Sequence, residues 1–210
     1  MQTFQPQLDE LTDLISSWHG LTSDTDPALA TDCLPLLDLL GDAHKLVDVG
    51  SGTGMPGLVL KIARPDLAVT LIEASQRKAA FLVHASSKLH LESVEVIRLR
   101  AEEAGRHGRL RESFDVAVAR ALAEMYVLAE LCLPLVRIGG RLLAMKTDVE
   151  RELAVAEKII DRLGGRVVEV RPAPTQAREN GQIVVIEKVE PTPPEFPRRP
   201  GVPSHRPMFV

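Results

Sequence analysis

The stretch Leu46–Gly57 reads LVDVGSGTGMPG, an apolar run that leads into a loop with glycines at positions 50, 52, 54 and 57. Glycines two residues apart permit a tight turn with positive φ and let a ligand touch the backbone. Pro56 suits the first turn of a helix, because first-turn amides have no helical partner. The stretch therefore predicts a strand, a glycine loop, and a helix that starts near Met55 or Pro56.

Outward from this unit, short strands rich in Val, Ile and Leu alternate with helical patterns. The strands lack strict polar alternation, which is typical of parallel strands covered on both faces. The pattern predicts an α/β fold with a Rossmann-like, doubly wound, mostly parallel sheet. Its last two strands are expected to form an antiparallel edge hairpin. The predicted strands are Leu46–Gly50, Ala68–Glu73, Val94–Leu99, Phe114–Ala119, Arg141–Lys146, Arg166–Val170 and Gln182–Lys188.

Three segments follow from the helical patterns and from composition. Residues 1–44 predict two N-terminal helices, Phe4–Trp18 and Ala28–Leu40, and residues 45–190 form the sheet domain with helices at Ser75–His90 and Asp148–Gly164. Residues 191–210 contain seven prolines and three arginines, so they are expected to form a tail without a helix.

Composition narrows the class of protein. A chain of 210 residues with 45% hydrophobic and 26% charged residues fits one globular domain. Its apolar runs, about five to seven residues long, are far shorter than a membrane span, and its acidic opening does not resemble a secretory signal. Cys33 and Cys132 are far apart in apolar surroundings, which favours buried thiols over a metal site. We therefore expect a cytoplasmic monomer without a metal.

Charge is unevenly distributed along the chain. The net charge is −4, yet residues 1–44 contain eight acidic residues and no Lys or Arg. The rest of the chain carries all 25 basic residues and 21 of the 29 acidic ones. Any affinity for nucleic acid is therefore expected from residues 45–210.

The residues around the glycine loop indicate a nucleoside-containing cofactor. Gly52–Gly57 satisfies the dinucleotide fingerprint GxGxxG, and Glu73 follows about 20 residues later, where it can bind ribose hydroxyls. An acid at the open edge of a sheet has little structural reason to be there. Asp48 lies where dinucleotide folds place an apolar residue, and its carboxylate can receive the ammonium of a methionine group or orient the loop. This favours S-adenosylmethionine over a nicotinamide cofactor.

Several segments in order resemble the glucose-inhibited division protein B family, the small-subunit ribosomal RNA methyltransferases G. They are DVGSGTGMPGLVLKIARPD, LIEASQRKAAFL, RLRAEEAG, FDVAVARALAEM, GGRLLAMK and IVVIEKVEPTPPEFPRRPGVPSHRPM, which together span about residues 44–210. The resemblance implies S-adenosylmethionine-dependent methylation of guanine N7 in small-subunit (16S) ribosomal RNA.

The resemblance also implies a set of site residues. Arg100, Arg120 and Lys146 would position the substrate, and no general base is expected, because guanine N7 has a free lone pair at neutral pH. Their polar or charged side chains, and not the resemblance, make six further residues candidates for phosphate contacts, unless the tail docks back on the domain. They are Gln76, Arg77, Lys78 and the tail residues Arg198, Arg199 and Arg206. By the resemblance, the cofactor contacts would be Gly50, Met55, Glu73, Ala74, Ser75, Ala101, Glu102 and Arg120. The residues of the glycine loop add Asp48, Ser51, Gly52 and Gly54 to the expected cofactor contacts.

Two other functions stay open. GxGxxG and Glu73 also fit an NAD-dependent oxidoreductase, although the chain offers no catalytic Tyr-Lys or His pair for one. The N-terminal region is shorter and more acidic than in relatives of the family, which would suit a non-catalytic ribosome-assembly protein on the same fold.

Overall fold

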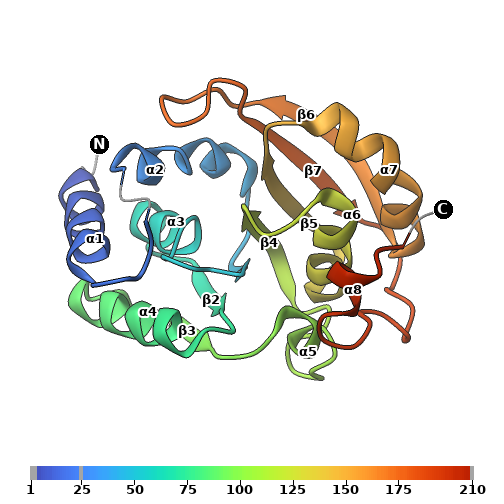
Figure 1. Ribbon diagram of the computed structural model, residues 1–210, viewed down its shortest axis with the longest axis horizontal. Helices are drawn as coiled ribbons and strands as arrows, with labels where there is room; N and C mark the ends of the chain where they lie inside the picture. Colours follow the sequence, from blue (N-terminus) through green and yellow to red (C-terminus); the bar gives the residue numbers. More distant parts are fainter. Residues whose placement is uncertain (1–3, 24–25, 209–210) are drawn as a thin grey trace.

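The computed structural model describes residues 4–23 and 26–208. Residues 1–3 and 24–25, which belong to the predicted N-terminal segment, and residues 209–210 of the predicted tail lie outside the described residues. The described part forms a seven-stranded sheet between two layers of helices (Figure 1).

The strand order is β3-β2-β1-β4-β5-β7-β6, which confirms the predicted fold class. Strands β1 to β5 are parallel to their neighbours within that group, and β7 pairs antiparallel with both β5 and β6. The strands are β1 (Lys45–Val49), β2 (Ala68–Ile72), β3 (Val94–Ile97), β4 (Phe114–Arg120), β5 (Val136–Lys146), β6 (Gly165–Pro172) and β7 (Gln182–Lys188).

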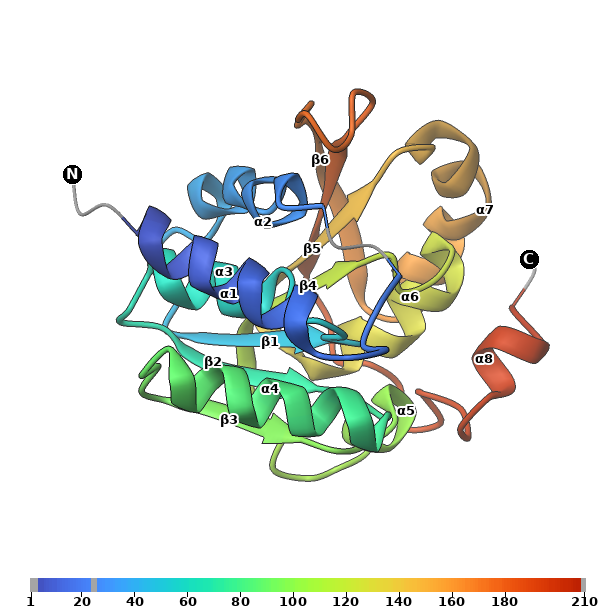
Figure 2. The same ribbon diagram turned by 60° about the vertical axis from the view of Figure 1, so that its left-hand side comes forward.

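Alternate residues of each strand point to opposite faces of the sheet, and each face carries one apolar cluster. Leu46 belongs to the first cluster and Val47 to the second. The first lies under α1 (Gln5–Ser17), α2 (Ala28–Thr31), the 3-10 helix η1 (Leu34–Leu39), α3 (Gly57–Ala63) and α4 (Gln76–Lys88). The second lies under α5 (Ala101–Ala104), α6 (Met125–Cys132), the 3-10 helix η2 (Leu133–Leu135) and α7 (Val149–Arg162). Figure 2 shows α1 and α4 on the side of the sheet opposite α6 and α7.

Both ends of the described chain pack on this core. Leu8, Leu11 and Ile15 of α1 are buried in the first cluster, and Phe196 of the C-terminal segment is buried in the second. Both cysteines are buried free thiols, as expected, and burial raises the pKa of Cys33 to about 12.

Three expectations about elements were wrong. Ala28–Leu40 is two short pieces instead of one helix, because Pro35, in the first turn of the 3-10 helix, cannot donate a backbone hydrogen bond to the preceding turn. The tail does contain a helical turn, α8 (Val202–His205), in which Pro203 lies in the first turn. Strand β5 starts at Val136 rather than Arg141, since Gly139 and Gly140 continue it through an irregularity in its pairing with β4.

Candidate functional site

The glycine loop lies between β1 and α3 and needs glycine at two points for different reasons. Gly50 has a φ of +73°, which residues with side chains rarely adopt. Gly57 begins α3, and a Cβ there would lie only 2.7 Å from Oδ2 of Asp48. These two glycines let the chain turn sharply after β1 and let α3 pack directly on the strand.

Asp48 lies beneath the loop and is 1% exposed. Its Oδ2 accepts a hydrogen bond from the backbone N–H of Gly57 at 2.9 Å, and Ser51 Oγ donates to its backbone carbonyl at the same distance. Burial raises the pKa of Asp48 to about 7, opposed by the Gly57 hydrogen bond and by Arg120. Of the two roles considered from the sequence, this geometry favours orienting the loop.

The raised pKa of Asp48 predicts a pH-dependent stability difference between this chain and its Asp48→Asn variant. As pH rises from the unfolded value near 3.8 through about 7, the unfolded chain releases this proton before the folded chain does. Stability from this group is therefore lost as pH rises through that window. Asparagine keeps an acceptor for Gly57, so the variant should gain stability relative to the parent as pH rises from about 4 to about 7 in urea unfolding. Parallel pH profiles for the two proteins would contradict this assignment.

Glu73 follows β2 and is largely buried. Its Oε2 accepts from the N–H of Gly52 at 2.9 Å, and its Oε1 accepts from the N–H of Ser75 at 2.7 Å. The expectation that this acid has little structural reason to be there was wrong, because it joins the glycine loop to the start of α4. Each carboxylate oxygen has a second lone pair, so the same group can still accept hydrogen bonds from two hydroxyls.

A cavity of about 300 Å³ opens where β1, β2, β3 and β4 end. Ile72, Leu99 and Leu122 give it apolar walls, and Lys78 also lines it. Six of the sequence-predicted site residues line this cavity together, namely Gly50, Glu73, Ala74, Arg100, Ala101 and Glu102.

The other predicted site residues lie around the cavity without lining it. Ser51 and Gly54 are joined by a backbone hydrogen bond within the loop, and Ser75 caps α4 by accepting from the N–H of Lys78. Gly52 donates to Glu73 as described above, and Asp48 lies underneath. The residues outside the cavity lining are Asp48, Ser51, Gly52, Gly54, Met55, Ser75, Arg120 and Lys146.

Arg120 ends β4 and faces the N-terminal helices. Its Nη1 donates to the backbone carbonyl of Leu29 at 3.2 Å, and its Nη2 lies 3.5 Å from Sδ of Met55. Its Nη1 also lies 3.6 Å from Oδ2 of Asp32, a carboxylate with no exposed surface. The structure thus brings together two predicted cofactor contacts, Arg120 and Met55, beside an acid that the sequence did not single out.

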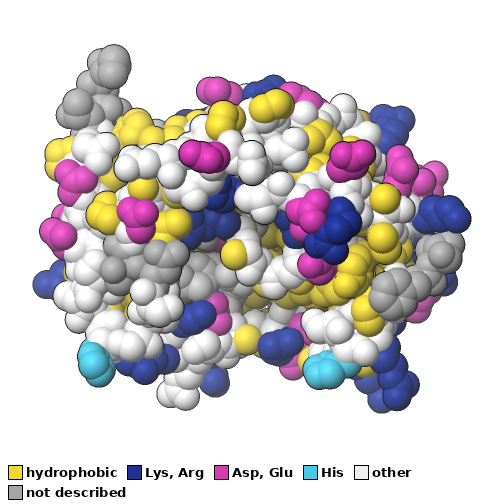
Figure 3. Space-filling model, turned by 45° about the horizontal axis from the view of Figure 1, so that its top comes forward, with side chains coloured by type: hydrophobic (Ala, Val, Ile, Leu, Met, Phe, Trp, Pro, Cys, Tyr) yellow, Lys and Arg dark blue, Asp and Glu magenta, His cyan; other side chains and the backbone are white. Residues whose placement is uncertain are grey.

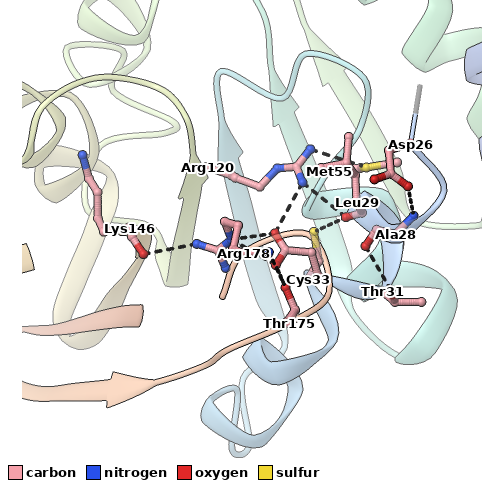
Figure 4. Close-up of polar contacts among 11 residues, drawn as sticks. Asp26, Ala28, Leu29, Thr31, Cys33, Met55, Arg120, Lys146, Thr175 and Arg178 are labelled. Carbon is pink, nitrogen blue, oxygen red and sulfur yellow. Dashed lines mark hydrogen bonds and ion pairs between the residues drawn. The ribbon is translucent and has the colours of Figure 1, made fainter. Parts of the chain in front are cut away.

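Asp32 is shared with the loop between β6 and β7. Arg178 Nε donates to both of its oxygens, at 3.0 and 2.8 Å, and Thr175 Oγ1 donates to Oδ1 at 2.5 Å. Figure 4 shows the contacts of Arg120 and Arg178 meeting beside Cys33 and Thr175. Among the described residues, Nη2 of Arg178 is the one buried side-chain nitrogen or oxygen without a hydrogen-bond partner. Asp32, in the N-terminal helical region, therefore connects Arg120 to the loop between β6 and β7.

The ammonium of Lys146 is engaged away from Arg120. It donates to the carbonyl of Ala123 at 2.5 Å and lies 2.6 Å from Oε2 of Glu152, while only the Lys146 backbone carbonyl contacts Arg178 (Figure 4). Arg100 lies in the cavity wall, with its Nη2 3.5 Å from Oε1 of Glu102. Arg100, Arg120 and Lys146, the three basic residues predicted to position the substrate, therefore contact different partners.

The candidates for phosphate contacts differ in their exposure and in their partners. Gln76 and Arg77 are exposed near the start of α4, and Arg199 and Arg206 are exposed in the tail. Arg198 is different, because its Nη2 lies 2.6 Å from Oε2 of the buried Glu130. For Arg198 the structure supports the other expectation, that the tail docks back on the domain, since its guanidinium balances a buried carboxylate.

The sequence-based reasoning missed Ser204, which lines the cavity from α8, and the pairing of Asp32 with Arg178. Asp32 and Arg178 are separated by 146 residues, so no local pattern could have joined them. No described helix has the length and apolar character needed to cross a membrane.

Comparison with known proteins gives a consistent result. Residues 7–180 match the model of the GidB family, described as rRNA small subunit methyltransferase G. A protein named ribosomal RNA small subunit methyltransferase G from Roseiflexus sp. (strain RS-1) is 51% identical over 170 residues, covering 80% of this chain and 73% of that protein. One of the same name from Chloroflexus aggregans is 48% identical over 212 residues, covering 98% of this chain and 89% of the relative.

Solved structures of methyltransferases share the fold. A T. thermophilus 16S rRNA N2 G1207 methyltransferase in complex with AdoMet and guanosine has a TM-score of 0.51 at 20% identity, covering 76% of this chain and 40% of that one. A Burkholderia thailandensis 1,6-didemethyltoxoflavin-N1-methyltransferase has a TM-score of 0.60 at 17% identity, covering 86% and 88% of the two chains. At these identities the likeness speaks for the architecture alone.

Proposed function

This chain belongs to the rRNA small subunit methyltransferase G family, and from that membership we propose that it methylates small-subunit ribosomal RNA with S-adenosylmethionine as methyl donor. The observation that carries the proposal is the cavity at the carboxyl ends of the parallel strands. It joins the glycine loop, Glu73 and the Ala101–Glu102 pair in one site. Ligands of doubly wound sheets bind at this edge.

The residues of the cavity fit the cofactor. Glu73 would accept hydrogen bonds from the ribose hydroxyls, and Ala101 and Glu102 would contact the base. Leu99 and Leu122 supply apolar walls for a flat ring, and Gly50 leaves the wall open, because a Cβ there would lie 2.6 Å from Leu122. When bound, S-adenosylmethionine supplies a methyl group already activated by its sulfonium.

We propose guanine N7 as the acceptor atom. N7 has a free lone pair, so the protein need not remove a proton before attack, and its task is alignment and exclusion of water. This suits a cavity whose acids, Glu73 and Glu102, already accept backbone N–H groups of the fold. Arg120, held by Leu29 and Asp32, is a positioning residue in this proposal, because a cation beside N7 would oppose the charge that the ring gains.

Calorimetric titration tests the cofactor class. We expect S-adenosylhomocysteine, the product of methyl donation, to bind the chain, and NAD not to bind. Tight binding of NAD alone would instead support the oxidoreductase, which the family assignment does not favour. Binding of S-adenosylhomocysteine without any methyl transfer would support the alternative that the chain is a non-catalytic ribosome-assembly protein.

The charge distribution predicts which form of the RNA is methylated. The net charge is −4, and Figure 3 shows acidic and basic side chains interspersed on the face that it presents. Phosphate neutralisation supplies most non-specific affinity for RNA, so free RNA should bind weakly. We expect faster methyl transfer to assembled small subunits that lack the modification than to naked ribosomal RNA at the same concentration. Equal rates on both substrates would contradict this prediction.

We also propose that the chain acts as a monomer in the cytoplasm. The support is indirect: the substrate of the relatives by name is ribosomal RNA, and both described ends of the chain pack on its own core. Light scattering on the purified protein tests the oligomeric state, and a dimer mass would overturn that part of the proposal.

A further inference from the structure

The C-terminal segment is attached to the domain by side chains of both: an arginine of the segment contacts the domain, and arginines of the domain contact the segment. Arg198 reaches inward to Glu130 of α6, whose carboxylate is 1% exposed. In return, Arg106 of the domain donates to the carbonyls of Pro197 and Glu195 at 2.6 and 2.7 Å. Arg111 adds a bond of 2.8 Å to the carbonyl of Phe196. These contacts hold the segment against α5 and α6.

Beyond this anchor the segment reaches the cofactor cavity. The backbone N–H of Gly201 donates to Oε1 of Glu102 at 2.8 Å. Glu102 is 2% exposed and lines the cavity, and so does Ser204 from the following turn, α8. Gly201 has a φ of +82°, so the turn that presents its N–H to Glu102 needs a residue that tolerates the left-handed region.

The family model ends at residue 180, so it does not include Gly201 or Ser204. Ser204 nevertheless lines the same cavity as Glu73 and Gly50, and the N–H of Gly201 binds the carboxylate of Glu102, which also lines it. Glu102 has no other backbone donor among the hydrogen bonds of the described residues, and its side-chain partner is Arg100 at 3.5 Å. The orientation of its carboxylate therefore depends mainly on Gly201.

We propose that residues 201–204 are part of the cofactor site: Gly201 positions the Glu102 carboxylate, and the side chain of Ser204 contacts the bound cofactor. This inference rests on the proposed function for the identity of the ligand. It assigns the segment to cofactor binding, in contrast to a role in gripping RNA.

The test measures binding of S-adenosylhomocysteine by calorimetry to full-length variants, together with their melting temperatures. Gly201→Val should weaken binding about tenfold or more, because the loss of positive φ displaces the N–H from a charged acceptor. Gly201→Asn should restore binding, since asparagine tolerates the left-handed region and keeps its N–H. Gly41→Val is the matched control, because Gly41 also has positive φ, at +53°, but has nothing within 4 Å of its Cβ position.

A second pair of variants tests the contact with the ligand. Ser204→Trp places a bulky ring toward the cavity and should also weaken binding about tenfold or more at an unchanged melting temperature. Arg206→Trp puts the same ring two residues away, on an exposed side chain that does not line the cavity, and should bind like the parent. Parental affinity in both Gly201→Val and Ser204→Trp would overturn the inference while leaving the proposed function intact. Failure of the parent chain itself to bind S-adenosylhomocysteine would overturn both.

Discussion

Glu73→Ala is expected to weaken binding of S-adenosylhomocysteine by about 10- to 150-fold. The proposed loss is a pair of charge-assisted hydrogen bonds to the ribose hydroxyls, worth about 1.5–3 kcal/mol. The same substitution removes the acceptor of the Gly52 and Ser75 N–H groups, so the glycine loop loses its link to α4 as well. Both effects weaken binding. The measurement is the dissociation constant from calorimetry.

Glu95→Ala is the matched control for this loss of a carboxylate. Glu95 lies on the adjacent strand β3 and forms an exposed pair with Arg109 at 2.7 Å, which should contribute little to stability. We expect this variant to bind like the parent. An unchanged dissociation constant in Glu73→Ala would contradict both the proposed ribose contact and the contribution of the Gly52 and Ser75 hydrogen bonds to binding.

Arg198→Ala is expected to reduce the free energy of unfolding by about 3–5 kcal/mol, because it leaves the carboxylate of Glu130 buried without its cation. Three side-chain hydrogen bonds to Glu130 would be lost, at 2.9, 3.1 and 2.6 Å, together with one to the carbonyl of Arg206 at 2.7 Å. The backbone bond from Arg198 to Glu130 at 2.8 Å would remain. Urea unfolding measures the change.

The neighbouring arginine provides the control. Arg199 is exposed, and Arg199→Ala should change the free energy of unfolding by less than about 0.5 kcal/mol. In addition, the double variant Glu130→Leu with Arg198→Met should recover much of the lost stability, because a buried pair can be replaced by apolar groups at small cost. Equal effects of Arg198→Ala and Arg199→Ala would contradict the role given to the buried pair.

The sheet could be predicted from the sequence because its signals are local. The apolar run before Gly50 and the glycine spacing predicted β1, the turn and α3, and similar runs located the other strands to within a few residues, except for the start of β5. The break at Pro35 was missed because the apolar spacing continues through it, although the proline itself signals a helix start.

The site was less predictable, because hydrogen-bond partners depend on chain segments that only the fold brings together. Six predicted residues line one cavity, yet the sequence does not show that Glu102 accepts from Gly201, which lies 99 residues later. Likewise, the charge of Arg198 suggested phosphate binding, and only the burial of Glu130 reveals its partner. Side-chain type predicts the chemistry that a residue can do, whereas burial decides which partner it has.

Methylation of guanine N7 is tested by transfer of a labelled methyl group from S-adenosylmethionine to small ribosomal subunits that lack the modification, followed by nucleoside analysis. We expect label in 7-methylguanosine at a single position of the small-subunit RNA. Label in an exocyclic amine, a ring carbon or a ribose hydroxyl would contradict the proposed acceptor atom. No transfer, in a chain that binds S-adenosylhomocysteine, would contradict the proposed methyltransferase activity itself.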